Sequence, residues 1–383
     1  MKKKNIFYWS PHFSNVATIN NVINSAYSLK KYDDNSFDVK IIDAIGEWKK
    51  FKDKLSQKKI DYLKLGWLDL SKYFPVSGFI YSRFLSILLI LYGFFPLKKI
   101  LQKEKPNFLI VHLITSLPLL IIILFKIDTK IILRISGLPK LTIFRKFFWK
   151  IVSKNIFLVT CASEETKVAI TKLGIFSEDK IITLYDPIIN VSYFNKKKKN
   201  KLDKNLQNKN YFLSIGRLTR QKNQQLLVNL FSILKKENKN FYLYIIGDGG
   251  GKIFLNNLIK KLNLSENVFL LGYKENVFPY IKSAKAIFSS SLWEDPGAVM
   301  IEAAFCNTLV ISSDCMSGPK EFLENGKAGY LFENNNIKSL KNSLDKFFNE
   351  NSDKKKEKKI LAKKNSKKYT IFSHYLALKK IIN

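Results

Sequence analysis

Two acidic residues, Glu294 and Glu302, stand with seven residues between them in the segment SSSLWEDPGAVMIE, residues 289–302. Pro296 and Gly297 interrupt the chain between them, and the small residues that follow predict a helix beginning near Gly297. The first N–H groups of a helix attract phosphate, because they lack partners within the helix and lie at the positive end of its dipole. A carboxylate beside them can accept hydrogen bonds from sugar or ribose hydroxyls. The segment therefore suits a bound sugar nucleotide, but acid pairs at this spacing also occur by chance in many helices, so the surrounding motifs decide between the two interpretations.

A basic loop precedes this segment in the sequence, in GRLTRQKN at 216–223. The apolar run at 211–215 predicts a strand, and helical spacing resumes at Leu226. Arg217 and Lys222 therefore lie on a strand-to-helix loop, which is where open α/β sheets bind their ligands. Two cations in that place are suited to a diphosphate.

A glycine-rich turn, GDGGG at 247–251, follows the next predicted strand. It does not satisfy the G-x-x-x-x-G-K-[ST] pattern, because Ile253 follows Lys252 where Ser or Thr is required. It does not satisfy G-x-G-x-x-G either, because Lys252 takes the place of the last glycine. Taken alone, these glycines are interpreted as an ordinary tight turn.

Together these segments resemble the retaining glycosyltransferases of family 4, which have the GT-B fold. The shared motifs occur in order between residues 211 and 332, as GRLTRQKN at 216–223, IIGDGG at 245–250, LLGY at 270–273, the pair Glu294 and Glu302, and SDCMSGPKEFLENGKAGYLF at 313–332. The resemblance implies an α/β protein with two Rossmann-like, doubly wound parallel-sheet domains and an inter-domain cleft. The first half of the chain is similar to the family only in general layout. The glycine pair that many members carry in the first strand–helix loop is absent here.

The resemblance also implies roles for individual side chains. Glu294 is the predicted catalytic residue and would contact the donor sugar near the reacting carbon. Whether Glu294 acts as a nucleophile stays open, because the retaining mechanism of the family is usually described as front-face attack by the acceptor. Glu302 would accept hydrogen bonds from the ribose hydroxyls. Arg217 and Lys222 would hold the diphosphate as negative charge builds on it.

Backbone groups complete the predicted donor site. The amides of Gly297, Ala298 and Val299 would bind the diphosphate or the sugar, and Tyr273 would lie by the base. Gly318 is expected to let the backbone approach the ligand. The sequence has no Asp-x-Asp motif in a suitable strand context, so we expect no metal and no cofactor apart from the nucleotide-sugar donor substrate.

Three residues that end predicted strands in the first half are candidates for contact with the acceptor, namely His112, Arg134 and Ser136. For His112 the alternative, a buried and hydrogen-bonded histidine, stays open.

The composition fits a cytoplasmic protein with an anionic partner. The three cysteines have neither metal-like nor paired spacing, which is typical of a reducing compartment. The net charge is +34, and the sequence contains far more lysine than arginine. Base recognition and phosphate forks favour arginine, whereas lysine is attracted to anionic lipid. We therefore expect a peripheral location at the inner face of the plasma membrane and no nucleic acid, with compositional drift as the other explanation of the lysines.

Apolar runs that alternate with helical patterns predict parallel α/β units. Strands are predicted at 5–9, 38–43, 108–112, 130–135, 156–160 and 181–184, and then at 211–215, 241–246, 267–271, 286–290, 308–312 and 329–332. The predicted domains are an acceptor-binding domain at 1–190 and a nucleotide-sugar-binding domain at 210–365, joined by a polar linker at 191–209. A helix at 366–383 is expected to cross back to the first domain.

Two apolar stretches approach the length of a membrane span. The first, 79–95, contains Arg83 and lies in a longer segment, 70–99, for which two interpretations stay open: an interfacial helix that dips into lipid, or a core-facing helix. The second, 108–127, carries His112 and Pro118 and is predicted to be a buried strand, a turn and a buried helix.

The sequence thus predicts a hexosyltransferase-type enzyme that moves a sugar, with retention, from a nucleotide diphosphate, with UDP favoured, to a lipid-linked or polysaccharide acceptor. The form DCMSGP at 314–319 resembles bacterial surface-polysaccharide members of the family, which implies O-antigen or capsule synthesis. Two alternatives stay open. One is a GT-B enzyme that is not a transferase, such as a UDP-sugar epimerase. The other is a basic membrane- or nucleic-acid-binding protein with an inactive sugar-nucleotide domain.

Overall fold

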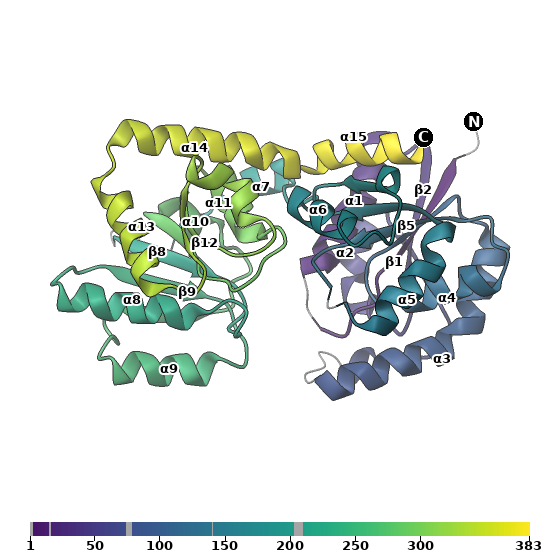
Figure 1. Ribbon diagram of the computed structural model, residues 1–383, viewed down its shortest axis with the longest axis horizontal. Coiled ribbons are helices and arrows are strands. Elements are labelled where there is room, and N and C mark those ends of the chain that lie inside the picture. The colour runs from purple at the N-terminus through teal and green to yellow at the C-terminus, as the bar shows by residue number, and fades with distance from the viewer. Residues whose placement is uncertain (1–2, 15–16, 74–78, 140, 203–209) are drawn as a thin grey trace. The chain divides into compact units, whose positions relative to one another are not determined.

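The computed structural model describes residues 3–14, 17–73, 79–139, 141–202 and 210–383. The chain divides into two compact units, shown in Figure 1. Unit 1 contains Met1–Pro187 and Ile371–Asn383, and unit 2 contains Ile188–Thr370.

Unit 1 is built on a seven-stranded parallel sheet with the order β3-β2-β1-β4-β5-β6-β7. Its strands are β1 (Lys4–Trp9), β2 (Phe37–Asp43), β3 (Asp61–Lys64), β4 (Phe108–Val111), β5 (Lys130–Ile135), β6 (Ile156–Cys161) and β7 (Ile181–Thr183). The strand order reverses between β1 and β4, so the sheet is doubly wound, and its switch point lies between these two strands.

Helices cover both faces of this sheet. Successive residues of a strand point to opposite faces, so Ile6 and Tyr8 are buried on one side of β1 and Phe7 and Trp9 on the other. The first face is covered by α1 (Ala17–Asp33), α2 (Lys52–Gln57) and α15 (Ile371–Ile382). The second is covered by α3 (Phe79–Glu104), α4 (Ser116–Leu124), α5 (Ile143–Val152) and α6 (Glu164–Thr171).

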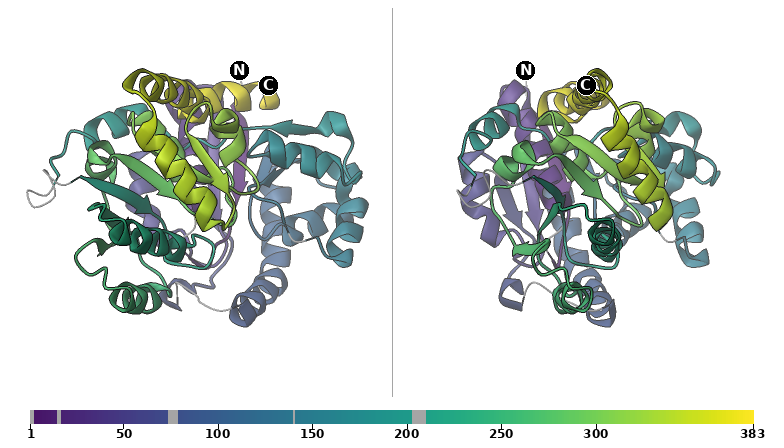
Figure 2. Two further views of the ribbon diagram at one scale, coloured as in Figure 1. Left: turned by 60° about the vertical axis from the view of Figure 1, so that its left-hand side comes forward. Right: turned by 90° about the vertical axis from the view of Figure 1, so that its left-hand side faces the viewer.

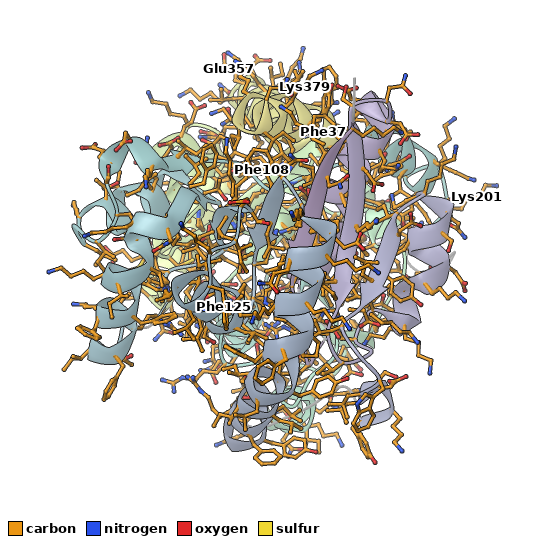
Figure 3. The ribbon with its side chains drawn as sticks, turned by 90° about the vertical axis from the view of Figure 1, so that its right-hand side faces the viewer. Phe37, Phe108, Phe125, Lys201, Glu357 and Lys379 are labelled. Atoms are coloured by element: carbon orange, nitrogen blue, oxygen red, sulfur yellow. The ribbon has the colours of Figure 1, made fainter. Side chains whose placement is uncertain are left out.

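The last helix of the chain, α15, belongs to unit 1 and packs on α1. Its apolar residues at spacings of three and four are all buried, namely Ile371, Tyr375, Leu378 and Ile382. Lys379 Nζ lies 2.6 Å from Asp33 Oδ2 on α1. Figure 3 labels Lys379 near Phe37 and Phe108, which begin β2 and β4.

The helix α3 has a buried face and an exposed face. Leu85, Leu89, Leu97 and Leu101 are buried in the core, which confirms the core-facing interpretation for that side of the helix. Within the described residues, α3 is the one helix long and apolar enough to cross a membrane, with a mean hydropathy of 1.8 over its most apolar window. Part of the longer predicted segment, 74–78, lies outside the described residues. The second apolar stretch forms β4 and α4, as predicted.

Unit 2 is built on a six-stranded parallel sheet with the order β10-β9-β8-β11-β12-β13. Its strands are β8 (Tyr211–Ile215), β9 (Tyr242–Ile246), β10 (Val268–Gly272), β11 (Ala286–Ser289), β12 (Leu309–Asp314) and β13 (Tyr330–Glu333). The switch point of this sheet lies between β8 and β11.

One face of this sheet is covered by α8 (Gln224–Lys236), α9 (Lys252–Lys261) and α13 (Ile337–Asn349), which share a core with alternate strand residues such as Phe212 and Phe288. Helices α8 and α9 lie side by side in Figure 1 and in both views of Figure 2. The other face is contacted by α11 (Ala298–Phe305), α12 (Pro319–Phe322) and α14 (Ser352–Ser366).

Each of the strands predicted from the sequence is present, with its ends shifted by two residues at most. The strand β3 was not predicted, because its short run, Asp61–Lys64, is only half-buried at the edge of the sheet and carries no clear alternation.

The predicted linker was wrong over its first part. Residues 191–197 form helix α7, which belongs to unit 2. Phe194 is buried, and its ring centroid lies 4.3 Å from that of Phe278 on α10 (Phe278–Ser283). Aromatic packing around Phe194 therefore outweighs the lysines that surround it in the sequence. The part of the predicted linker at 203–209 lies outside the described residues.

Candidate active site

The switch point of unit 2 brings two of the predicted site residues together. Lys222 ends the loop after β8, and Glu294 follows β11, the strand beside β8. Lys222 Nζ forms an ion pair with Glu294 Oε1. The pair is largely sheltered from water, because the side chain of Glu294 is 9% exposed and that of Lys222 is 20% exposed.

Glycines shape the loop that carries Lys222. A Cβ placed on Gly216 would lie 3.3 Å from the aliphatic stem of Lys222, so the absence of a side chain leaves the room that this stem occupies. Gly247 has φ of 143°, and a Cβ there would overlap the carbonyl of Gly216. The glycine run interpreted above as an ordinary turn therefore packs against the Lys222 loop and holds it in place.

Several polar residues that the sequence did not point to hold Glu294 and its segment. Ser291 Oγ donates a hydrogen bond to Glu294 Oε1 at 2.5 Å. Ser313 Oγ in turn donates to the carbonyl of Ser291 at 2.5 Å. Glu294 thus accepts hydrogen bonds from a cation and a hydroxyl, which hold its carboxylate in one orientation.

Hydrogen bonds to backbone carbonyls also join the two strand-to-helix loops. The Leu292 amide donates to the carbonyl of Gln221 at 2.8 Å, and Gln221 Nε2 donates to the carbonyl of Trp293 at 3.0 Å. Ser290 Oγ donates to the carbonyl of Lys222 at 2.8 Å. The only sequence signal for these residues is their position next to Lys222 and Glu294.

The predicted helix after Gly297 is present as α11, and Gly297 stands at its N-cap with φ of 87°. The first N–H groups of a helix have no partners within it, so Ala298 and Val299 present amides at this end. The expectation that Gly318 lets the backbone approach the ligand stays a prediction. A Cβ there would lie 2.7 Å from the carbonyl oxygen of Pro296, so Gly318 lets two loops of the protein approach each other.

Glu302 lies in the second turn of α11 and is half-buried. Burial raises the pKa of its carboxyl from the ordinary value of 4.5 to about 7. Glu302 therefore changes charge near neutral pH, which sets it apart from a solvated carboxylate on a helix surface.

The other two predicted donor side chains are more exposed. Arg217 is exposed in the loop after β8, and its Nη2 donates a hydrogen bond to Gln221 Oε1 at 3.4 Å. Tyr273 is 75% exposed and follows β10, the edge strand. Because β9 separates β10 from β8, the structure places Tyr273 apart from the Lys222–Glu294 pair.

In unit 1, His112 follows β4 at the switch point of its sheet, and its amide donates to the carbonyl of Trp9 at 2.9 Å. The ring is buried, and neither ring nitrogen has a hydrogen-bond partner among the described residues. Burial, with the nearby charge of Arg134, holds the pKa of His112 well below its ordinary range. The alternative interpretation, a buried and hydrogen-bonded histidine, thus agrees with the burial of the ring but not with its hydrogen bonding.

Arg134 faces the interior of unit 1. Its guanidinium contacts Asp186 Oδ1 and the carbonyl of Leu184, each at 2.5 Å. Asp186 also accepts a hydrogen bond from Asn21 at 2.7 Å. Arg134 therefore has a structural function in joining β5 to the segment after β7, and its contact with an acceptor stays a prediction.

Ser136 follows β5, and its hydroxyl is buried without a hydrogen-bond partner in the part of the chain that the structure describes. Its acceptor contact also stays a prediction. Among the described residues, no cluster of three or more His, Cys, Asp or Glu side chains is placed to hold a metal ion.

Comparison with known proteins finds similarity to a family in the second half of the chain. Residues 195–380 match the family model for glycosyl transferases group 1. An uncharacterized glycosyltransferase of Methanocaldococcus jannaschii is 32% identical over 246 residues, which is 60% of this chain and 61% of that protein.

A second relative is the N-acetylgalactosamine-N,N'-diacetylbacillosaminyl-diphospho-undecaprenol 4-alpha-N-acetylgalactosaminyltransferase of Campylobacter jejuni. It is 36% identical over 130 residues, which is 34% of this chain and 35% of that protein. The chain thus matches less than two thirds of the length of either relative. The matched domain and these relatives support a transferase.

The fold extends over the whole chain. The structure of HepE from Anabaena in complex with UDP has a TM-score of 0.73 at 16% identity, and the similarity covers 99% of both chains. Together with the two parallel-sheet units, this similarity identifies the fold as GT-B, as predicted.

Proposed function

We propose that this chain, in which residues 195–380 match the family model for glycosyl transferases group 1, transfers a sugar with retention from a UDP-sugar to a lipid-linked or polysaccharide acceptor. The cellular process would be the synthesis of a bacterial surface glycan such as O-antigen or capsule, at the inner face of the plasma membrane. The observation that carries the proposal is the sheltered Lys222–Glu294 ion pair at the switch point of the unit 2 sheet, beside the start of α11.

The geometry suits the departure of a diphosphate. A cation on the loop after β8 and the first amides of α11 supply positive charge around one position, and fixed positive groups aimed at developing negative charge lower a barrier most effectively. Arg217 lies on the same loop and can add a second cation. In a front-face reaction the acceptor oxygen bonds to the anomeric carbon as the diphosphate leaves from the same side. The acceptor proton passes to a departing phosphate oxygen.

Glu294 would contact the donor sugar. Its carboxylate is already oriented by Lys222 and Ser291, so donor binding need not order it. When the diphosphate binds, Lys222 would share its charge between Glu294 and the phosphate oxygens. Glu302, near the middle of α11, would accept hydrogen bonds from the ribose. The amides of Gly297, Ala298 and Val299 would contact the diphosphate or the sugar.

The choice of donor and acceptor is supported by the related proteins. HepE of Anabaena is solved with UDP, and the Campylobacter relative is described as acting on a diphospho-undecaprenol acceptor with an alpha product. A lysine-rich chain with a net charge of +34 is suited to an acceptor held in an anionic membrane.

Donor choice is tested by thermal shift against UDP, GDP and their sugars. A ligand that binds only the folded protein at about 100 times its Kd stabilises it by about 2.7 kcal/mol, which is a readily measured shift. We expect UDP and UDP-sugars to stabilise the protein and GDP to have a much smaller effect. Equal shifts with GDP, or no shift with any nucleotide, would contradict the proposed donor. We also expect the activity to persist in EDTA.

Transfer itself is measured with a labelled UDP-sugar and a lipid-linked acceptor, and the anomeric configuration of the product is read by NMR. Glu294→Gln should abolish most of the transfer, whereas Glu275→Gln is a matched control, because Glu275 is 83% exposed and forms a long surface pair with Lys197. An inverted product would exclude retention. Release of an isomerised sugar nucleotide would favour the epimerase, and anionic ligand binding without any turnover would favour the inactive binding protein.

A further inference from the structure

The helix α5 exposes a row of large apolar side chains. Ile143, Phe144, Phe147 and Ile151 are 85%, 86%, 66% and 45% exposed, respectively. At 100° per residue these four positions fall within an arc of about 100° on the helix surface. The opposite side of α5 is anchored in the core of unit 1 by Trp149 and Val152. The row is therefore held outward by a folded helix.

Cations border this apolar row. Lys146 and Lys150 are exposed on α5 beside it, and Lys154 follows the helix. The segment 143–154 contains no acidic residue. A rigid helix with aromatic side chains on one arc and lysines next to it matches the chemistry of an interface between hydrocarbon and anionic headgroups.

A second apolar row lies on α3. Tyr81, Phe84, Ile87, Leu91 and Phe95 are all between 48% and 73% exposed. Their spacing of three and four residues places them on one face of the helix, opposite the buried leucines described above. Lys98 and Lys99 continue this face beyond Phe95.

The two rows belong to neighbouring parts of one face of unit 1. Helix α4 contacts both α3 and α5, and the three helices cover the same side of the sheet (Figure 1). Burial and, in addition, the positive charge of Arg83 on α3 lower the pKa of Arg145 on α5. Figure 3 labels Phe125, which follows α4 and packs against Phe94 of α3 with ring centroids 5.9 Å apart.

A groove adjoins the α3 row. It has a volume of about 510 Å³, and Leu63, Leu65, Phe95 and Ile100 give it an apolar lining. Lys99 and Lys103 lie in the same lining. Its one acidic residue, Glu104, is already paired with Lys40 at 3.3 Å. The groove therefore combines apolar side chains with lysines, as the surface of α5 does.

We propose that the exposed rows of α5 and α3, with the groove beside Phe95, form a docking surface that inserts into the headgroup region of an anionic phospholipid bilayer. This inference deepens the proposed function, on which it rests, by assigning the membrane contact to one face of unit 1. A second copy of the chain fits the same surface poorly, because an isologous contact through α5 would bring Lys146 and Lys150 of one copy close to the same lysines of the other, with no acidic partner on that helix. A membrane-crossing α3 fits poorly as well, because it would remove Leu85, Leu89, Leu97 and Leu101 from the core of unit 1.

The test is co-sedimentation of the full chain with vesicles of phosphatidylcholine, with and without phosphatidylglycerol. We expect binding to the anionic vesicles that weakens as salt is added. The double variant Phe144→Ser/Phe147→Ser should lower the partition coefficient at least about tenfold, because two aromatic side chains no longer enter the bilayer. Lys146→Gln/Lys150→Gln should lower it about thirtyfold on anionic vesicles only, since each lysine near such a surface contributes about a factor of five.

A matched control is Ile253→Ser/Phe254→Ser on α9, two exposed apolar residues in unit 2 at 75% and 55% exposure. This variant should bind vesicles as the wild type does. The α5 variants should keep the thermal shift with UDP, which separates loss of docking from loss of folding or of the proposed donor site. If the wild type does not bind anionic vesicles, or if the α9 variant loses as much binding as the α5 variants, the docking surface is refuted.

Two further outcomes would also overturn it. A wild-type dimer that becomes monomeric in Phe144→Ser/Phe147→Ser, measured by light scattering, would make the surface a contact between copies. Wild-type protein that stays in the membrane pellet after an alkaline carbonate wash would make α3 a spanning helix.

Discussion

Replacing Glu294 with Gln should separate binding of the nucleotide from transfer of the sugar. In the structure Lys222 is paired with Glu294, so part of the positive charge that a diphosphate would use is already neutralised. The glutamine keeps the size and one oxygen acceptor of Glu294 but removes its charge. We therefore expect UDP to bind at least as well to the variant as to the wild type.

The magnitudes follow from how sheltered the pair is. Breaking a buried ion pair costs about 3–5 kcal/mol, whereas an exposed pair is worth about 0–1 kcal/mol. With side chains that are 9% and 20% exposed, Glu294 and Lys222 lie between these limits, so we expect the variant to lose about 1–3 kcal/mol of folding free energy. The cation thus freed should strengthen UDP binding by up to about 1 kcal/mol, or about fivefold.

Transfer should respond in the opposite direction. The loss of one oriented polar group that acts on the transition state typically lowers kcat by about 10²–10³, or about 3–4 kcal/mol. UDP affinity is measured by calorimetry and kcat with a saturating donor. Lys222→Met is the mirror experiment and should weaken UDP binding as well as transfer. The reasoning is refuted if Glu294→Gln weakens UDP binding as strongly as it slows transfer, because Glu294 would then only support the loop.

The further predictions concern three single residues. Burial keeps Glu302 protonated in the folded protein up to its pKa of about 7, whereas in the unfolded chain this carboxyl ionises from about 4.5. The free energy of unfolding should therefore fall by at most about 3 kcal/mol as pH rises through this window. Urea unfolding at several pH values should show a smaller fall for Glu302→Gln. Donor binding should strengthen as Glu302 ionises above pH 7, and calorimetry of Glu302→Gln should lose that pH dependence. Asp186→Asn leaves Arg134 buried without its counterion and should cost about 3–5 kcal/mol by the same unfolding measurement, with no change expected for UDP binding. Phe194→Ala should cost about 3–5 kcal/mol of folding free energy and lower the melting temperature, because it removes the ring that packs on Phe278. An unchanged melting temperature would show that residues 191–197 add nothing to the stability of unit 2, as expected of a linker.

Much of unit 2 could be read from the sequence because its signals are local. Apolar runs of strand length ended at Gly216 and Gly247, and a Pro-Gly break preceded α11. Such strand ends and helix starts depend on the backbone preferences of a few residues. It therefore predicted that Lys222 and Glu294 each lie on a strand-to-helix loop.

The same reasoning failed where tertiary contacts outweighed the composition. The lysines around Phe194 indicated a loop, but one buried ring that packs on Phe278 holds a helix there. The close approach of Gly318 to Pro296 was likewise not predicted. In both cases the residue in contact is distant in the sequence, so a local sequence pattern does not predict the contact.

The sequence alone determined which residues could do chemistry and which elements carry them, because residue type, charge and periodicity are properties of the chain itself. Only the tertiary structure decided which of these residues meet. It joined Lys222 to Glu294 across 72 positions, committed Arg134 to Asp186 inside unit 1, and left the apolar rows of α3 and α5 facing outward. The physical reason is that pairing, burial and exposure depend on the order of strands in a sheet and on which helix face the core covers. Both are decided by contacts between segments far apart in the chain.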